Sequence, residues 1–248
     1  METLLGNGRM MDAEHSGSGK RICVAIDGPA GAGKSSVAKK VAQELNYLYI
    51  DTGAMYRAAT WVALEQKVDL ADEAHVVELV RRARIELLPP DQDSQGRVRV
   101  IVNGDDLSFI VRSRIITRFV SQVSAIGGVR QMLVEKQQQL ATAGGVVMDG
   151  RDIGTVVLPH AELKVFLTAS AEVRAQRRLK DMQEMGQTAD LQTITADIIQ
   201  RDHLDSTRAI SPLKQAEDAI LIDTDNFTQA EVCQKVLELC LEKIRSHS

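Results

Sequence analysis

Residues 28–35 read Gly28-Pro29-Ala30-Gly31-Ala32-Gly33-Lys34-Ser35, which matches the P-loop pattern G-x-x-x-x-G-K-[ST]. An apolar run precedes this stretch over residues 22–27, and Val37, Val41 and Leu45 follow it at helical spacing. A P-loop requires this order of strand, glycine loop and helix, because its backbone N–H groups and its helix N-terminus face phosphate oxygens. A glycine-rich turn that binds nothing would not need both flanks. We therefore predict a nucleoside triphosphate site, with Lys34 at the outer phosphates and the Ser35 hydroxyl on Mg²⁺.

Composition limits the classes of partner. The chain has 248 residues, of which 44% are hydrophobic and 3% aromatic, with a formal net charge of -4. This length suits one large α/β domain, and the aromatic residues are too few for a platform that stacks single-stranded nucleic acid. The negative charge argues against binding to nucleic acid or to an acidic membrane, and no apolar run reaches the length of a membrane span.

Two further features concern the compartment and the N-terminus. Cys23, Cys233 and Cys240 lack the spacing of a metal site, and an odd, sparse set indicates reduced thiols in a cytoplasmic protein. Residues 1–20 are rich in Gly, Ser, Asn and Met and lack the apolar stretch of a signal peptide. We expect a disordered leader there, or an upstream start ahead of Met10 or Met11.

Five apolar runs predict the strands of a parallel sheet. Near-continuous hydrophobicity is typical of strands that helices cover on both faces, and the helical segments between these runs predict βαβ crossovers. The sequence therefore predicts an α/β P-loop NTPase fold with a five-stranded parallel sheet flanked by helices. The predicted strands are Ile22–Asp27, Tyr47–Asp51, Val146–Asp149, Leu163–Leu167 and Ala219–Asp223.

The first three predicted strands end in Asp27, Asp51 and Asp149, at the sheet edge where open α/β folds bind ligands. At the other end of the chain, Thr228 and Glu231 form a capping box ahead of the last predicted helix.

Two segments depart from the alternation of strands and helices. Residues 68–143 include alternating valines at 98, 100 and 102, which predict an antiparallel hairpin within an inserted subdomain. Residues 170–205 are helical in pattern, strongly charged and interrupted near Gly186, which predicts a mobile helical hairpin over the ligand edge. The predicted core is then 21–67, 144–169 and 206–248.

Arginines suggest a second anion. Arg174, Arg177 and Arg178 would share one helix face, where their charges repel one another unless an anion binds or water solvates the face. Arg201, Asp205 and Arg208 would also share a face if their helix continues, although a surface ion pair explains the first two equally well.

The second and third strand ends add phosphate-binding groups. Residues 51–57 offer Thr52, Tyr56 and Arg57, and Arg151 follows the third strand. A guanidinium suits phosphate because its planar fork binds two oxygens at once. No Asn-Lys-x-Asp sequence for guanine is present. Two phosphate-bearing ligands that face each other favour phosphoryl transfer, which needs aligned oxygens, neutralised charge and exclusion of water.

The chain closely resembles the bacterial cytidylate kinases, a family of nucleoside monophosphate kinases, from about Arg21 to the C-terminus. Residues 149–157 are its most specific match. The stretches that carry the resemblance are Asp27–Ser36, Asp51–Arg57, Ser121–Val123, Asp149–Val157 and Arg201–Leu213. It implies transfer of a phosphoryl group from ATP to CMP or dCMP with Mg²⁺, in a monomer with a monophosphate-binding insert at 68–143 and a lid at 170–205.

The resemblance also implies residue roles. Ser121, Arg130 and Asp152 would recognise cytosine, whose exocyclic amine suits a carboxylate, and Asp205 would bind the ribose. The acceptor phosphate would be held by Arg57, Arg151, Arg201 and Arg208, with Thr52 and Tyr56 beside it. ATP would be bound by Gly28, Pro29, Ala30, Gly31, Ala32, Gly33, Lys34, Ser35, Ser36, Arg174 and Arg178. The catalytic set would be Lys34, Arg151, Arg178 and Arg208.

Two alternatives stay open. The first is a kinase for another monophosphate, AMP or dTMP, although a purine needs a larger pocket than the cytosine set suggests. The second is a regulatory protein that binds nucleotide without turnover.

Overall fold

The computed structural model describes residues 21–94, 96–184, 186 and 188–246, so the expected leader at 1–20 lies outside the described residues. A five-stranded sheet in the order β2-β6-β1-β7-β8 forms the centre, and every pairing in it is parallel. This architecture confirms the predicted fold class. Its strands are β1 (Cys23–Asp27), β2 (Leu48–Asp51), β6 (Val146–Gly150), β7 (Leu163–Thr168) and β8 (Ile220–Asp223).

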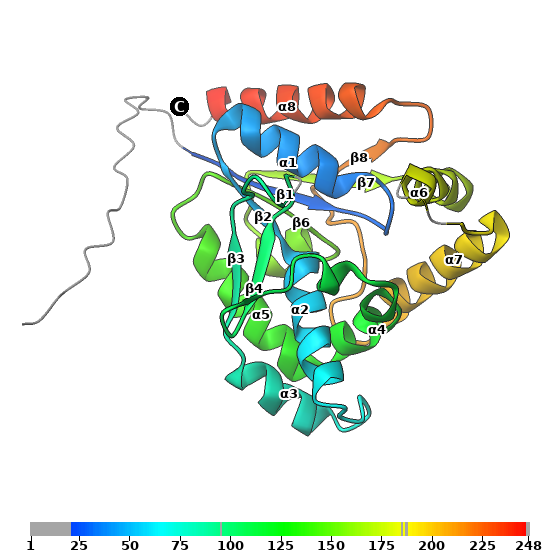
Figure 1. Ribbon diagram of the computed structural model, residues 1–248. Coiled ribbons are helices and arrows are strands. Elements are labelled where there is room, and N and C mark those ends of the chain that lie inside the picture. The colour runs from blue at the N-terminus through cyan, green and yellow to red at the C-terminus, as the bar shows by residue number, and fades with distance from the viewer. Residues whose placement is uncertain (1–20, 95, 185, 187, 247–248) are drawn as a thin grey trace, which may run out of the picture.

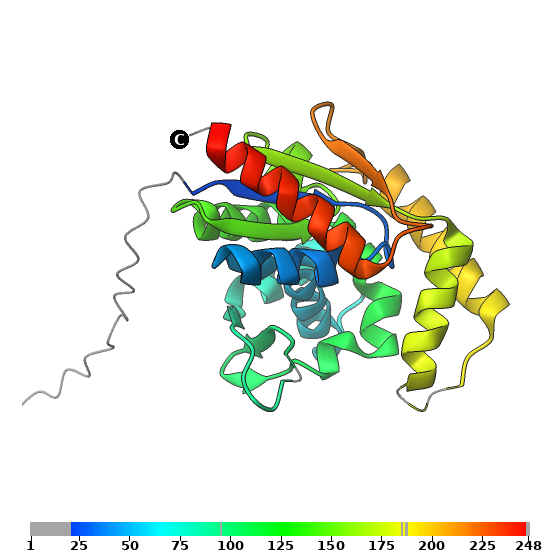
Figure 2. The same cartoon turned by 90° about the horizontal axis from the view of Figure 1, so that it is seen from above.

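Helices cover both faces of this sheet (Figure 1). On one face α1 (Lys34–Leu45) and α8 (Gln229–Ser246) bury a cluster that includes Val24, Val37 and Val236, and Figure 2 shows α8 lying across the strands. On the other face lie α2 (Thr52–Glu65) and α5 (Gly127–Ala141), with the short π-helical turn η2 (Ile153–Val157). Burial on both faces is the reason that the strands read as unbroken apolar runs.

The register of the strands gathers their acidic ends. Asp149 on β6 is opposite Asp51 on β2 and opposite Ile26 on β1, one residue before Asp27. These three aspartates therefore lie at one carboxyl edge, as the sequence predicts.

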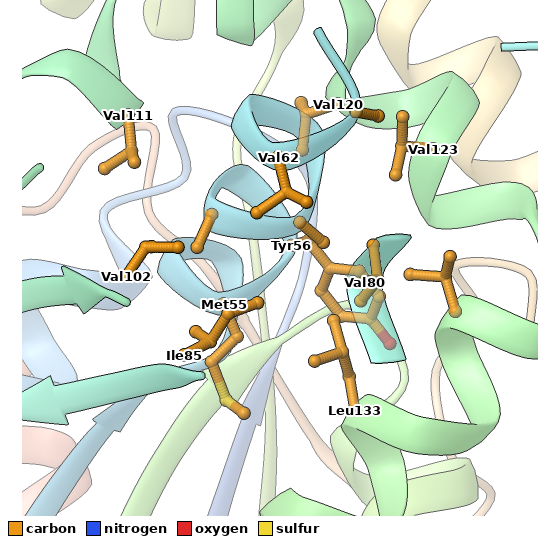
Figure 3. Close-up of a cluster of buried hydrophobic side chains, with 14 of the residues drawn as sticks. Met55, Tyr56, Val62, Val80, Ile85, Val102, Val111, Val120, Val123 and Leu133 are labelled. Carbon is orange, nitrogen blue, oxygen red and sulfur yellow. The ribbon is translucent and has the colours of Figure 1, made fainter. Parts of the chain in front are cut away.

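The segment 68–143 holds a second, small sheet. Strands β3, β4 and β5 form it and pair antiparallel, so the predicted hairpin is confirmed. The segment also contributes helices that share a core with α2, in which Met55 and Tyr56 meet Ile85, Val102 and Leu133 (Figure 3). Besides α5, its elements are α3 (Glu73–Arg82), β3 (Ile85–Leu88), β4 (Arg99–Val102), β5 (Asp105–Asp106), the 3-10 helix η1 (Ile110–Arg112) and α4 (Arg114–Ala125).

Two helices, α6 (Ala171–Glu184) and α7 (Leu191–Thr207), extend from the end of the sheet (Figures 1 and 2). They pack together through Ala175, Met182, Ile194 and Ile198. Helix α7 ends at Thr207, and Arg208 follows it with φ -60° and ψ 142°. Arg208 therefore does not share a helical face with Arg201 and Asp205, because its backbone is no longer helical.

No helix in the described part of the chain is both long enough and apolar enough to cross a membrane.

The start of α8 has the predicted capping box. The Thr228 N–H donates to Glu231 Oε2 at 2.7 Å, and the Glu231 N–H donates to Thr228 Oγ1 at 3.3 Å. We expect Thr228→Ala to lower the free energy of unfolding by about 1 kcal/mol, because the Glu231 N–H loses its acceptor, the Thr228 hydroxyl. Urea denaturation measures this. Thr195→Ala on α7 is the control, with a change within about 0.5 kcal/mol, and equal effects of the two variants would contradict the capping role.

Candidate active site

The loop between β1 and α1 is shaped by its glycines. Gly28, Gly31 and Gly33 have φ values of 144°, 81° and 87°, and a Cβ on Gly28 would lie 1.9 Å from the Leu167 carbonyl oxygen. No described side chain caps the N-terminus of α1, and its first turn has no acidic residue. Its first N–H groups thus remain available to an anion, which the helix dipole also favours.

Lys34 is almost fully buried beneath this loop. Its Nζ donates to the Pro29 carbonyl at 2.7 Å. Burial, with Arg151 nearby, holds the pKa of Lys34 well below its usual value. An anionic ligand at the loop would stabilise the charged ammonium.

Beside the loop, Ser35 contacts Asp149, for which the sequence predicts a place at the ligand edge but no role. Ser35 Oγ donates to Asp149 Oδ2 at 2.8 Å, and the Tyr49 hydroxyl donates to Asp149 Oδ1 at 2.9 Å. Burial, then the nearby Asp51, raises the pKa of Asp149 to about 6. A hydroxyl and a carboxylate are the hard oxygen donors that Mg²⁺ prefers, and Mg²⁺ commonly binds through one or two such groups together with substrate phosphates.

Asp27 joins the end of β1 to the turn after β6. Its two carboxylate oxygens accept from the Ile153 and Gly154 N–H groups at 2.8 and 2.7 Å. Asp27 therefore fixes the backbone that carries Arg151 and Asp152. The strand position of Asp27 could be predicted from the sequence but this role could not, because its partners lie more than a hundred residues away.

Asp205 on α7 forms the first of two arginine–carboxylate groups. It accepts from Arg151 Nε at 2.9 Å and from Ser121 Oγ at 3.2 Å, and Arg201 Nε lies 3.9 Å away. Burial alone would raise the pKa of Asp205, but Arg151 and Arg201 hold it below its usual value. The structure thus brings together residues from α4, from α7 and from the turn after β6.

Asp152 forms the second group. Its carboxylate pairs with Arg130 of α5, and Arg208 Nη2 lies 3.6 Å from Asp152 Oδ1. The Arg130 guanidinium lies over the Tyr56 ring, 5.3 Å from the centroid. The Tyr56 hydroxyl is buried near these charges, whereas Thr52 Oγ1 donates to the Asp149 carbonyl at 2.7 Å.

Two arginines carry charge that the protein compensates poorly. Arg57 Nη1 donates to Thr117 Oγ1 at 2.8 Å, and burial lowers the pKa of Arg57 to about 10. Burial, followed by repulsion from Arg151, lowers the pKa of Arg201 to about 9. A phosphate among these guanidinium groups would relieve the repulsion.

Two of the three arginines of α6 contact other parts of the chain. Arg174 makes a two-fold pair with Asp202 at 3.0 and 2.6 Å and donates to the Ala30 carbonyl at 3.0 Å. Arg177 donates to Thr224 Oγ1 at 3.0 Å and to its carbonyl at 2.6 Å. In the described structure the chain supplies partners for these two, and a shared anion-binding face stays a prediction. Arg178 is exposed.

The buried Asp27 carboxyl gives a pH prediction. Burial raises the pKa of Asp27 from 3.8 to about 6, although the Gly154 and Ile153 N–H groups oppose the shift. A raised pKa means that the carboxyl's contribution to stability is full below pH 3.8 and is lost as the pH rises through about 6. Relative to wild type, Asp27→Asn should gain about 2.4 kcal/mol in unfolding free energy from pH 4 to pH 7.

Urea denaturation at a series of pH values measures this gain. Asp190→Asn is a control whose stability difference should change with pH in the opposite direction. Asp190 caps α7, and the hydrogen bond that its carboxylate accepts from the Thr193 N–H lowers its pKa. A stability difference for Asp27→Asn that is the same at every pH would rule out the buried carboxyl as the cause.

The sequence is similar to known proteins over most of its length. Residues 24–242 match the family described as cytidylate kinase. The cytidylate kinase of Desulforamulus reducens is 53% identical over 87% of this chain and 95% of its own length. The cytidylate kinase of Bacillus velezensis is 50% identical over 91% and 99%, and that of a Geobacillus species is 52% identical over 90% and 98%. With the P-loop and the arginine–carboxylate groups at one sheet edge, these matches show that the chain belongs to the cytidylate kinase family.

Proposed function

We propose that this protein phosphorylates CMP and dCMP with ATP, giving CDP or dCDP and ADP by direct in-line transfer. The observation that carries the proposal is the meeting of two anion sites at one edge of the sheet. One is the P-loop after β1, and the other is the set of arginines around Asp152 and Asp205. Asp27 connects them through the backbone of η2.

The donor side is formed by residues 28–36. The N–H groups of the loop would bind the phosphates of ATP, and Lys34 would leave the Pro29 carbonyl to reach them. Ser35 and Asp149 would hold Mg²⁺, which when bound neutralises phosphate charge. Ser36 is exposed beside Ser35 at the start of α1, where its N–H faces the same anion.

The acceptor side would bind CMP in two parts. Arg57, Arg151 and Arg201, whose charges act on one another, would surround the phosphate, and Arg208 lies closer to Asp152. Ser121, Arg130 and Asp152 would recognise cytosine, and Asp205 the ribose. The Asp152 carboxylate would accept from the exocyclic amine of cytosine, whereas the carbonyl of uracil would be repelled.

The protein's share of the chemistry is alignment and electrostatics. Lys34, Arg151 and Arg208 would stabilise charge on the transferring group. Exposed Arg178 would come to the donor phosphates from α6, while Arg174 braces the loop through Ala30. We propose that α6 and α7 act as the lid that excludes water, residues 68–143 as the monophosphate-binding insert, and the rest of 21–248 as the core.

The setting follows from the chemistry. The three cysteines of the protein are free thiols, which are typical of a reducing cytoplasm. We propose that the protein is a cytoplasmic monomer. We also propose that its partners are small nucleotides and that it binds no nucleic acid.

A panel of monophosphates tests the proposal. With ATP and Mg²⁺, we expect kcat/KM for CMP and dCMP to exceed that for AMP and dTMP at least about a hundredfold, because thymine presents a carbonyl where Asp152 would accept from the amine of cytosine, and a purine needs a larger pocket. A coupled assay of ADP release measures this. Faster turnover of AMP than of CMP would contradict the proposal, as would ATP binding without release of ADP.

A substitution at Arg57 tests the acceptor site separately. Arg57→Met should lower kcat/KM for CMP about a hundredfold, because one charge contact to the phosphate is removed, while ATP binding stays within about threefold. Steady-state kinetics and calorimetry with ATP measure the two effects. Arg81→Met is the matched control, since Arg81 is exposed on α3 and pairs only with Glu78 in the described structure. Unchanged CMP turnover in Arg57→Met would refute the assignment of Arg57.

A further inference from the structure

Thr117 on α4 contacts an arginine of the acceptor side. Its Oγ1 accepts a hydrogen bond from Arg57 Nη1 at 2.8 Å, although the two residues are 60 positions apart in the sequence. Helix α4 packs against α2, which carries Arg57 (Figure 1), and Val120 and Val123 of α4 lie in the core that the two helices share. The contact therefore joins two packed helices rather than a helix and a loop.

A second hydrogen bond fixes the direction of the first. The Thr117 hydroxyl donates to the Ser113 carbonyl at 2.9 Å, one turn earlier in α4. A hydroxyl has one proton, so only the lone pairs of Thr117 Oγ1 remain for other groups. Thr117 thus faces Arg57 as a neutral hydrogen-bond acceptor.

Arg57 differs from the other arginines of the acceptor side in the charge of its partner. In the described part of the chain, no carboxylate oxygen lies within ion-pair distance of the Arg57 guanidinium, whereas each of the other four arginines has one. Arg130 and Arg208 face Asp152, and Arg151 and Arg201 face Asp205. A hydroxyl takes the place of the carboxylate at Arg57 alone in this set.

The charge of Asp51 acts on Arg57, but the Asp51 carboxylate is bound elsewhere. Asp51 Oδ1 accepts from the Ala54 N–H at 2.9 Å, and Asp51 Oδ2 lies 3.5 Å from Arg112 Nη2. Burial lowers the pKa of Arg57 to about 10, and Asp51 opposes this fall without reversing it. Arg57 is therefore ordered by the protein while much of its charge stays uncompensated.

We propose that Thr117 is a positioning residue for the acceptor phosphate: its neutral oxygen orients the Arg57 guanidinium and leaves the positive charge of Arg57 free for the phosphate. A carboxylate in this place would also orient Arg57, but it would neutralise the cation and repel the phosphate. Because Arg57 is already ordered, less side-chain freedom is lost when the phosphate binds. This inference rests on the proposed CMP kinase activity, because it adds a residue behind the acceptor phosphate.

Thr117→Val tests the positioning role, because valine keeps the branched shape and removes the hydroxyl. We expect KM for CMP to rise about tenfold, with kcat and KM for ATP each within about twofold, since Arg57 loses its acceptor. Thr117→Ser keeps the hydroxyl and should restore KM to within about twofold of wild type. Steady-state kinetics measure all three values.

Thr142→Val is the matched control. Thr142 is exposed just after α5, and its hydroxyl also donates to a carbonyl four residues earlier, that of Gln138, at 3.2 Å. No arginine contacts Thr142 in the described structure, so KM for CMP should stay at the wild-type value. A rise in this variant as large as that in Thr117→Val would overturn the role of the arginine contact.

Inhibition by cytidine separates positioning of Arg57 from a general displacement of α4. Cytidine has the base and ribose of CMP but no phosphate, and Ser121 of the proposed base site lies on the same helix. Thr117→Val should leave the inhibition constant of cytidine within about twofold, because Arg57 acts on the phosphate alone. Equal weakening of cytidine and CMP would overturn the positioning role, as would an unchanged KM for CMP in folded Thr117→Val.

Thr117→Asp and Thr117→Asn test the importance of a neutral acceptor, because the two side chains have the same size and differ in charge. The aspartate variant should have a KM for CMP at least about fivefold above that of the asparagine variant, although a carboxylate binds Arg57 more strongly. A smaller ratio would overturn the charge argument. This pair also decides the matter if Thr117→Val does not fold.

The wild-type assay separates the two proposals. Wild-type protein that does not phosphorylate CMP overturns the proposed function and this inference with it. Active wild type with unchanged kinetics in the folded Thr117 variants overturns the inference alone.

Discussion

The concentration of buried positive charge at one sheet edge is the constraint on which the site depends. Arg57 and Arg201 have lost most of their hydration, and their pKa values fall because water no longer stabilises the cations and other guanidinium groups lie nearby. Asp205 and Asp152 compensate part of this charge, and the folded core holds the rest in place. The fold thus stores an unfavourable interaction that a bound anion would relieve.

The parallel sheet makes such a concentration possible. Strands β1, β2 and β6 end at one edge, so residues from distant parts of the chain meet there without long loops. Asp27 then ties the end of β1 to the turn that carries Arg151 and Asp152. The P-loop and the arginine groups are therefore held in one rigid frame, as in-line transfer requires.

The parts that could be predicted from sequence are those with a local physical signature. The P-loop, the five strands and the Thr228–Glu231 cap depend on neighbours in the chain, and the structure has all of them. Pairings between residues that lie far apart in the sequence could not be predicted from it. Asp202 neutralises Arg174 from 28 residues away, and Asp149 accepts from Ser35 across 114 residues. Whether the helix continues as far as Arg208 stayed open in the sequence, and the structure ends α7 at Thr207.

The paired carboxylates explain how so many arginines stay ready for a ligand. A free guanidinium on a long side chain would lose rotamer freedom when it binds a phosphate. Asp205 already holds Arg151, and Asp152 already holds Arg130, so that part of the ordering is complete before any ligand arrives. A doubly charged phosphate would attract Arg151 more strongly than a single carboxylate does, and Asp205 would then be released toward a neutral donor such as a hydroxyl. In the proposed complex the same carboxylates would orient the cations first and accept hydrogen bonds from the nucleoside afterwards.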